Sequence, residues 1–543
     1  MNRSKTLYVF LFLCIIIACA LRYFVFLNTQ HLDGESIGRI IFSCRFSENP
    51  WKLLSGVKII EYGTGGQQWY YFLNALLIHI FDHPIFISRL SSLIFGLLVI
   101  IPYYLLVKSS FPVPIAICST LSLCFYVVHI QLSVSSMANA GYILFVVLAF
   151  LFLTLYFSSE YKKRVYFWSS IIFTILATSF RLEAWILVII FPSFLLSQRK
   201  KRDALIFLIL SSLYIFKTLL SFYQTREPFG FLRNSLINPD FSHKGFTFLT
   251  TRPDMPLGVN YQFSVWIFTL IYTLSPFIFF LGLTGMYCSS KDKRQLKFLI
   301  LFWSFFLLLT VRQIMSNQYP YIRYSAILAI FFIPFAFLGT VKIIKNIHHF
   351  LGIKLKYKNS LTYVGLAIIT VYFTVYSLRL LNKEIPKMQY NKFIIDLANL
   401  IRENCREGDI IISSLDSLTL GTGITLNGYI CTDILSSSGE EERLYINFED
   451  DRTYEFYDYI SKKISPKLYK RIAQFIIKCH LNRKGENINV RLITKRRGSR
   501  EVKRFIFILD DYDFTYLKAN FPDLYKNLIM IKKYTLGEAT DRL

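Results

Sequence analysis

The chain has 543 residues, of which 54% are hydrophobic, and a formal net charge of +26. So much apolar material excludes an ordinary soluble protein and indicates a polytopic membrane protein. The charge does not indicate nucleic-acid binding, because about 34 Lys and Arg against 12 acids in residues 1–381 lie mostly in short loops, as the positive-inside rule expects.

The first apolar run, Leu7 to Leu27, follows Arg3 and Lys5. It is too long for the apolar region of a signal peptide and lacks a clear cleavage site, so we expect a retained signal-anchor with a cytoplasmic N-terminus. The run Trp69 to Phe81 is too short to span a membrane, and we expect an interfacial helix within a first outer loop at 28–85.

If the run Trp69 to Phe81 does not cross the membrane, the second span starts outside, and the direction of each later span follows. Ten further apolar runs follow between about Pro84 and Leu381, which gives about 11 transmembrane helices. With the short helix kept out of the membrane, every basic cluster falls on the cytoplasmic side. We therefore predict a multi-pass protein of the cytoplasmic membrane, with a transmembrane module at 1–381 and an extracytoplasmic domain at 382–543.

The C-terminal segment has the composition of a soluble domain. Ile394 to Asn404 is typical of an amphipathic helix, while Asp409 to Ser413 and Phe505 to Leu509 are typical of short strands. The alternation predicts a small soluble α/β domain. The nine cysteines form no CxxC pair, and their spacing does not indicate a metal site.

Acidic residues gather in the first outer loop. Residues 1–380 hold about twelve carboxylates, and five of them lie here: Asp33, Glu35, Glu48, Glu61 and Asp82. Carboxylates beside a membrane are costly to keep and are usually functional. Asp33 and Glu35 have the spacing of a catalytic base with a helper. Catalysis is the favoured role of Asp33. The alternative is that Asp33 begins the helix expected at Ser36 to Phe46 as its N-cap, and the two roles are compatible.

Several motifs in residues 5–345 together resemble the GT-C superfamily of lipid-linked-sugar glycosyltransferases. The resemblance is closest to the family of protein O-mannosyltransferases and lipid A aminoarabinose transferases (glycosyltransferase family 39-like). The elements that carry it are Asp33-Gly34-Glu35, Trp69 to Asn74, Ser88-Arg89-Leu90, Arg181-Leu182-Glu183-Ala184-Trp185, and Arg323-Tyr324 with Pro334.

The resemblance implies an inverting glycosyltransferase of the cell envelope, a hexosyl- or pentosyltransferase acting on the extracytoplasmic face. Its donor would be a polyprenyl-phosphate sugar, and its acceptor a glycan, lipid or protein. It implies no certain cofactor and leaves a divalent cation open. Two features depart from the family pattern: Gly34 separates the two acids, and Asn139 stands where the second outer loop often carries an acid.

The donor phosphate needs cations that stay charged in a low-dielectric site, which arginine provides. Arg89, Arg181 and Arg323 are predicted at the outer ends of three spans, where a snorkelling role is the alternative. Further candidate contacts to donor or acceptor are Glu61, Tyr62, Glu183 and Tyr324. The favoured interpretation of Glu183 is that it pairs with a neighbouring Arg. The favoured interpretation of Glu61 to Gly66 is a flexible loop.

Other signals are weaker. His31 and His79 lack the spacing of a metal site. Asp510-Asp511-Tyr512-Asp513 imitates the metal-nucleotide motif of soluble transferases, but the predicted topology keeps it away from nucleotide sugars. A transporter or flippase of lipid-linked glycans is the main alternative function, although no half-repeat is visible. A sensor or scaffold would explain the C-terminal domain but not the acids of the loop.

Overall fold

The computed structural model describes most of the chain up to residue 388 and three short strands beyond it. The described residues are 3–29, 36, 39–40, 43, 46–47, 49–53, 67–81, 83–158, 163–224, 261–290, 292–316, 321–350, 358–388, 410–413, 445–447 and 505–508. The acids Asp33, Glu35 and Glu61, together with Tyr62 and His31, lie outside this set. The chain divides into two compact units, Met1–Met388 and Gln389–Leu543.

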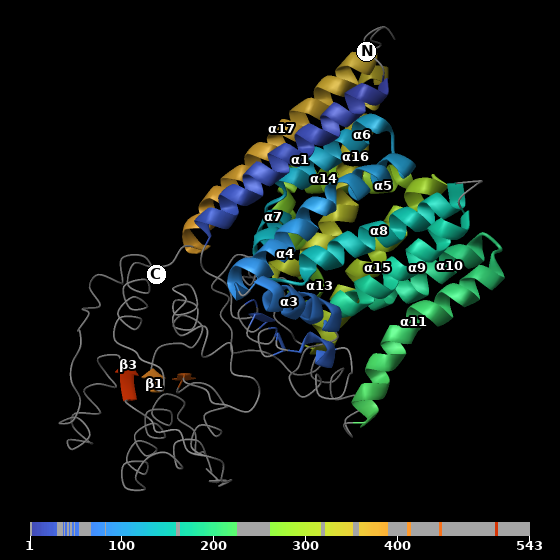
Figure 1. The fold of residues 1–543 in the computed structure, drawn as a ribbon. Coiled ribbons are helices and arrows are strands. Elements are labelled where there is room, and N and C mark those ends of the chain that lie inside the picture. The colour runs from blue at the N-terminus through green and yellow to red at the C-terminus, as the bar shows by residue number, and fades with distance from the viewer. Residues whose placement is uncertain are drawn as a thin grey trace. The chain divides into compact units, whose positions relative to one another are not determined.

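The first unit is a bundle of helices (Figure 1). Its helices are α1 (Arg3–Asn28), α3 (Gln68–Phe81), α4 (Pro84–Leu98), α5 (Ile100–Ser110), α6 (Val113–Phe125), α7 (Val127–Val134), α8 (Asn139–Ser158), α9 (Lys163–Phe180), α10 (Leu187–Ser197), α11 (Lys201–Gln224), α13 (Tyr261–Leu274), α14 (Pro276–Ser289), α15 (Lys293–Ser316), α16 (Ser325–Phe350) and α17 (Lys358–Glu384). Short 3₁₀ helices are η1 (Pro50–Leu53), η3 (Leu182–Ile186), η5 (Ile322–Tyr324) and η7 (Ile385–Met388).

Six described helices are long and apolar enough to cross a membrane, or up to eight spans if each bent pair counts as one. The unit is therefore a multi-pass membrane protein, as predicted. Each of the eleven predicted spans coincides with a helix or a broken helix, but α9 to α11 do not meet this test of length and composition. The count of eleven stays a prediction, as does the interfacial position of α3.

Two of the spans are broken. The helices α6 and α7 bend by 53° at Tyr126, and α13 and α14 bend by 116° at Ser275. At the second break Ser275 has a positive φ of 82°, and its Oγ accepts a hydrogen bond from the amide of Ile278. Pro276 follows at the first position of α14, where its missing amide hydrogen is tolerated. The local sequence therefore starts a new helix here.

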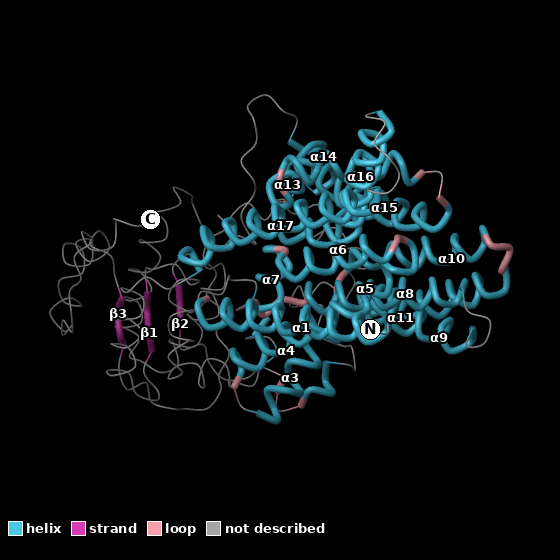
Figure 2. The backbone as a smooth tube through the Cα atoms, turned by 90° about the horizontal axis from the view of Figure 1, so that it is seen from above, coloured by secondary structure: helices cyan, strands magenta, loops and turns pink. Residues whose placement is uncertain are grey.

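Close backbone contact holds α14 against α16. A Cβ atom at Gly285 would lie 1.8 Å from the carbonyl oxygen of Phe335, and one at Gly339 would lie 2.0 Å from that of Leu281. Small residues let helix backbones approach in membranes, where packing replaces the hydrophobic effect as the driving force. Figure 2 shows α6 between α1 and α17, and α6 packs against both.

The described part of the second unit is a parallel three-stranded sheet in the order β2-β1-β3. Its strands are β1 (Ile410–Ser413), β2 (Tyr445–Asn447) and β3 (Phe505–Ile508), with Ile411 opposite both Tyr445 and Ile506. The strands predicted near residues 409 and 505 are present as β1 and β3, and β2 was not predicted. The soluble α/β domain stays a prediction. The helix predicted at 394–404 and the acids 510–513 lie outside the described residues.

Candidate functional site

Four chain segments meet in a small pocket at one end of the helical bundle. They are the start of α8, the turn from α9 into η3, the last turns of α15, and η5 with the start of α16. The pocket is lined by Asn139, Tyr142, Ile143, Arg181, Glu183, Leu309, Arg323, Tyr324, Ala326 and Ile327. Four of the site residues predicted from the sequence therefore lie together in this pocket: Arg181, Glu183, Arg323 and Tyr324.

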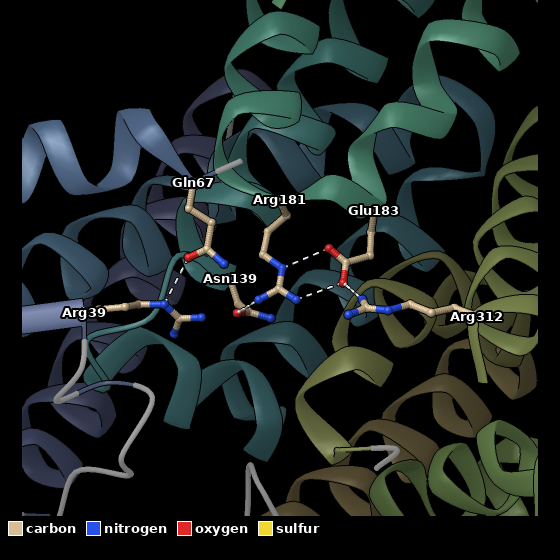
Figure 3. A network of polar contacts seen from close by, with 6 residues as sticks. All are labelled: Arg39, Gln67, Asn139, Arg181, Glu183 and Arg312. Carbon is tan, nitrogen blue, oxygen red and sulfur yellow. Dashed lines mark hydrogen bonds and ion pairs between the residues drawn. The ribbon is translucent and has the colours of Figure 1, made fainter. Parts of the chain in front are cut away.

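Arg181 is held by hydrogen bonds on two sides. Its Nε and Nη2 donate to Oε2 and Oε1 of Glu183 at 2.9 and 2.8 Å, which forms a planar, bidentate pair. Its Nη1 donates to Oδ1 of Asn139 at 3.1 Å. Figure 3 shows the guanidinium between these two partners. Arg181 has extended backbone angles, so η3 begins only after it and the guanidinium and carboxylate face each other.

Glu183 also binds a second arginine, from α15. Nη1 of Arg312 donates to Oε1 of Glu183 at 2.6 Å, and Arg312 approaches from the side opposite Asn139 (Figure 3). Burial would raise the pKa of Glu183, but the two guanidinium groups outweigh it and lower that pKa below its usual value. Glu183, in the turn between α9 and α10, is therefore an anion that orients two cations. The favoured interpretation of Glu183, pairing with a neighbouring arginine, is confirmed.

Three guanidinium groups surround the ring of Tyr324. The Cζ atoms of Arg181, Arg312 and Arg323 lie 5.1, 5.2 and 5.2 Å from its centroid. Cations at this distance are attracted to the face of an aromatic ring. Arg181 and Arg323 are almost fully buried. We call these three arginines with Tyr324 and Glu183 the arginine cluster.

The arginine cluster carries more positive than negative charge. Among its members, three guanidinium groups meet a single carboxylate. Asn139, which accepts a hydrogen bond from Arg181, is a neutral amide at a position where the family that the motifs resemble often has an acid. Such a cluster is suited to an anion with several oxygen atoms, for which guanidinium groups provide bidentate hydrogen bonds.

Tyr142 adds a hydroxyl group to the same pocket. Its side chain is buried, and among the residues that the structure describes its Oη has no hydrogen-bond partner. A buried hydroxyl without a partner costs free energy, and a bound ligand can remove that cost. The sequence offered no signal for Tyr142, which lies inside an apolar run.

Arg89 does not belong to this pocket. It lies on α4, where its Nε donates to the carbonyl of Val134 at 2.8 Å and its Nη2 donates to that of Phe26, also at 2.8 Å. Its Cζ also lies 4.0 Å from the ring centroid of Phe26. These contacts join α4 to the ends of α1 and α7. A phosphate contact for Arg89 stays a prediction.

Two further arginines, Arg312 and Arg39, lie near the pocket. Neither Arg312 nor Arg39 was predicted as a site residue from the sequence. Arg39 is buried, and its Nε donates to Oε1 of Gln67 at 3.0 Å on the Asn139 side of the network (Figure 3). Arg312 had a usable signal, since it ends an apolar run at the same predicted face as Arg181 and Arg323. Within the described residues no group of three His, Cys, Asp or Glu could hold a metal ion, and His79 is exposed on α3.

Comparison with known proteins identifies the fold. No protein-family model matches the chain, and no curated protein matches it in sequence. The structure resembles archaeal oligosaccharyltransferase AglB from Archaeoglobus fulgidus, solved with an inhibitory peptide and a dolichol-phosphate (TM-score 0.57, 11% identity, 88% of this chain and 69% of that chain covered).

It also resembles ArnT from Cupriavidus metallidurans. The apo structure gives a TM-score of 0.53 at 12% identity, and the structure bound to undecaprenyl phosphate gives 0.51 at 13% identity. Each comparison covers 87% of this chain and 95% of that chain. The chain therefore shares its fold with AglB and ArnT, as the resemblance of its motifs to GT-C glycosyltransferases predicted.

Proposed function

We propose that the chain is a glycosyltransferase that moves a sugar from a polyprenyl-phosphate donor to an acceptor on the extracytoplasmic face of the membrane. The observation that carries the proposal is the arginine cluster, with three guanidinium groups about 5 Å from the ring of Tyr324. The GT-C fold supports it, and the related structures named above include complexes with dolichol-phosphate and with undecaprenyl phosphate.

The reaction requires both a base and a site for the leaving group. An acceptor hydroxyl or amine attacks the anomeric carbon and gives its proton to a carboxylate, for which Asp33 or Glu35 is proposed. The bond between the anomeric carbon and the phosphate oxygen breaks, and the sugar is transferred with inversion. The leaving polyprenyl phosphate gains a negative charge in this step.

The arginine cluster is suited to that change in charge. The donor is a phosphodiester with one negative charge, whereas the leaving monoester approaches two. Fixed cations in a buried site stabilise the transition state more than the ground state when charge increases there. Because Glu183 already orients Arg181 and Arg312, little reorganisation is needed as the charge develops. Arg181, Arg312 and Arg323 are proposed as the phosphate contacts, and Tyr142 as an additional donor.

A direct assay tests this function. The purified full chain is incubated with polyprenyl-phosphate sugars and candidate acceptors, and released polyprenyl phosphate is measured by mass spectrometry. We expect release with at least one donor, and loss of release in Arg323→Ala. A matched control is Arg379→Ala, which removes an arginine of α17 outside the pocket. Failure of every donor, with folded protein, would argue against the proposal.

A transporter or flippase of lipid-linked glycans is the second candidate. The broken pairs α6/α7 and α13/α14 favour it, because interrupted helices are common in transporters. Proteoliposomes with a labelled lipid-linked sugar in one leaflet distinguish the two functions. Movement of intact donor to the other leaflet without release of polyprenyl phosphate would support transport.

A further inference from the structure

A second cationic site lies at the opposite end of the helices that carry the arginine cluster. The helix α8 begins at Asn139 in the candidate site and reaches Tyr156 seventeen positions later, about 26 Å at ~1.5 Å per residue. Lys297 and Arg312 of α15 are fifteen positions, or about 23 Å, apart. These lengths approach the hydrocarbon thickness of a bilayer, roughly 30 Å. The second site is therefore on the other face of the membrane.

Two lysines converge there on one pair of aromatic rings. The Nζ of Lys200, in the turn between α10 and α11, lies 3.8 Å from the ring centroid of Tyr156 and 5.4 Å from that of Phe157. The Nζ of Lys297, on α15, lies 3.9 Å from the ring centroid of Phe157. We call Tyr156, Phe157, Lys200 and Lys297 the lysine pocket. Its members come from three separate segments of the chain.

The backbone holds Lys200 in place at some cost. The amides of Arg199 and Lys200 donate to the carbonyls of Leu196 and Leu195 at 2.9 and 3.0 Å, which is the Schellman pattern that closes a helix. That motif puts Arg199 in the left-handed region at φ 59°, where glycine is favoured.

The surrounding charge is strongly positive. The connections 156–164, 198–203 and 290–297 contain eleven Lys and Arg against three acids. Of those acids, Asp203 accepts a hydrogen bond from the hydroxyl of Tyr156. Partial burial and the neighbouring Lys163 lower the pKa of Lys200. In the part of the chain that the structure describes, neither Lys200 nor Lys297 forms a salt bridge.

We propose that the lysine pocket binds the phosphate group of an anionic membrane lipid in the leaflet opposite the candidate active site. Two lysine ammonium groups on an aromatic base provide the charge, and basic pockets between transmembrane helices suit lipid headgroups. Leu196 and Ile300, four and three positions from Lys200 and Lys297 in the sequence, have exposed apolar side chains on which acyl chains would lie. A lipid would place its phosphate at the lysines and its acyl chains on the apolar side chains, whereas a free phosphate would contact the lysines alone. The proposal does not depend on the glycosyltransferase reaction.

Lipid capture in nanodiscs tests the proposal. The full chain is purified into phosphatidylcholine nanodiscs with a trace of phosphatidylglycerol, and bound phosphatidylglycerol is measured by native mass spectrometry. We expect enrichment of the anionic lipid by the unmodified chain. In the double variant Lys200→Ala with Lys297→Ala the enrichment should fall by roughly fivefold per lysine.

The matched control removes the same charge from the same face. Lys201→Ala with Lys293→Ala changes two exposed lysines beside the pocket, and should retain most of the enrichment. Replacement of Lys200 and Lys297 by Arg should retain it too, because arginine keeps both the charge and the stacking on the rings.

Three outcomes would overturn the proposal. Equal loss in both alanine pairs would show a general attraction of basic loops to an anionic membrane. Displacement of the lipid by millimolar inorganic phosphate would identify a site for a soluble phosphate compound. Absence of enrichment by the unmodified chain would reject the site whether or not the variants fold.

Discussion

The carboxylate of Glu183 joins the turn before α10 to helix α15, because its Oε1 accepts a 2.6 Å hydrogen bond from Nη1 of Arg312, 129 positions further along the chain. The same oxygen accepts from Arg181 at 2.8 Å. One buried anion thus fixes two of the three cations around Tyr324. The geometry of the proposed phosphate site depends on this residue, even though Glu183 itself would repel a phosphate.

Glu183→Gln should therefore impair both folding and function. Gln keeps the size of the side chain but removes the anion that pairs with the buried Arg181 and the partly buried Arg312. Breaking a buried pair in this way costs about 3–5 kcal/mol. We expect a lower thermal midpoint of the detergent-solubilised protein, measured by intrinsic fluorescence, and weaker transfer. Glu384→Gln, which changes another buried acid outside the pocket, serves as a comparison. A midpoint and activity equal to those of the unmodified chain would contradict the central role of Glu183.

Arginine geometry in the cluster should matter beyond charge. If Arg181 and Arg323 bind the donor phosphate through their planar forks, Lys should recover only part of the activity lost in Ala. The defect should fall on kcat/KM for the lipid-linked donor, because charge on the phosphate increases as the sugar leaves. Full rescue by Lys, with Ala reducing expression only, would instead indicate snorkelling side chains. Full activity in both Ala variants would remove these residues from the site and leave Arg89 as the remaining arginine predicted from the sequence.

Asp33→Asn tests the proposed base. The amide keeps the shape and cannot accept the proton of the acceptor, so turnover should fall by about 10²-fold or more while the protein stays folded. Glu35→Gln should have a smaller or comparable effect. Single-turnover measurements with a saturating donor separate the chemical step from binding. Near-normal turnover in Asp33→Asn would transfer the role to Glu35 or end the proposal.

Arg22→Leu should destabilise the helical unit. Arg22 of α1 is fully buried, and it donates to Nδ1 of His129 at 2.8 Å, to Oγ of Ser133 at 3.3 Å and to the carbonyl of Cys124 at 3.2 Å. It thereby joins α1 to both halves of the bent span at Tyr126. Loss of these bonds leaves buried polar groups unsatisfied at about 1–3 kcal/mol each. Thermal unfolding in detergent should show a lower midpoint, with Arg22→Lys intermediate. An unchanged midpoint in the Leu variant would contradict this role.

Cysteine labelling tests the membrane topology. In a background without native cysteines, an impermeant reagent applied from outside should label single cysteines at Ser47, Ser242 and Ser437. The reagent should not label a cysteine at Ser290, because the loop that follows Ser290 is rich in Lys and Arg and is predicted to be cytoplasmic. Labelling at Ser290 with protection at Ser437 would reverse the predicted parity and move the proposed active site to the cytoplasmic face.

The sequence was sufficient to predict the class of the molecule and the position of most helices. Apolar runs and the charges between them are local features, and a membrane allows few arrangements for a run such as 139–158. The motif around Arg181 and the pair Arg323-Tyr324 also indicated the GT-C fold. Glu183 was correctly interpreted as pairing with a neighbouring arginine, because Arg181 lies only two positions away in the sequence.

Tertiary structure decided which distant side chains share the pocket. Tyr142 gave no signal, since it lies inside an apolar run, and the position of Arg312 at the end of one did not show that its guanidinium pairs with Glu183. Arg89, by contrast, matched the motif, but its guanidinium lies against Phe26 and Val134. Whether a buried arginine contacts a ligand or a helix end depends on helix packing across more than a hundred residues. That packing is set by contacts such as Gly285 against Phe335, which no local pattern encodes.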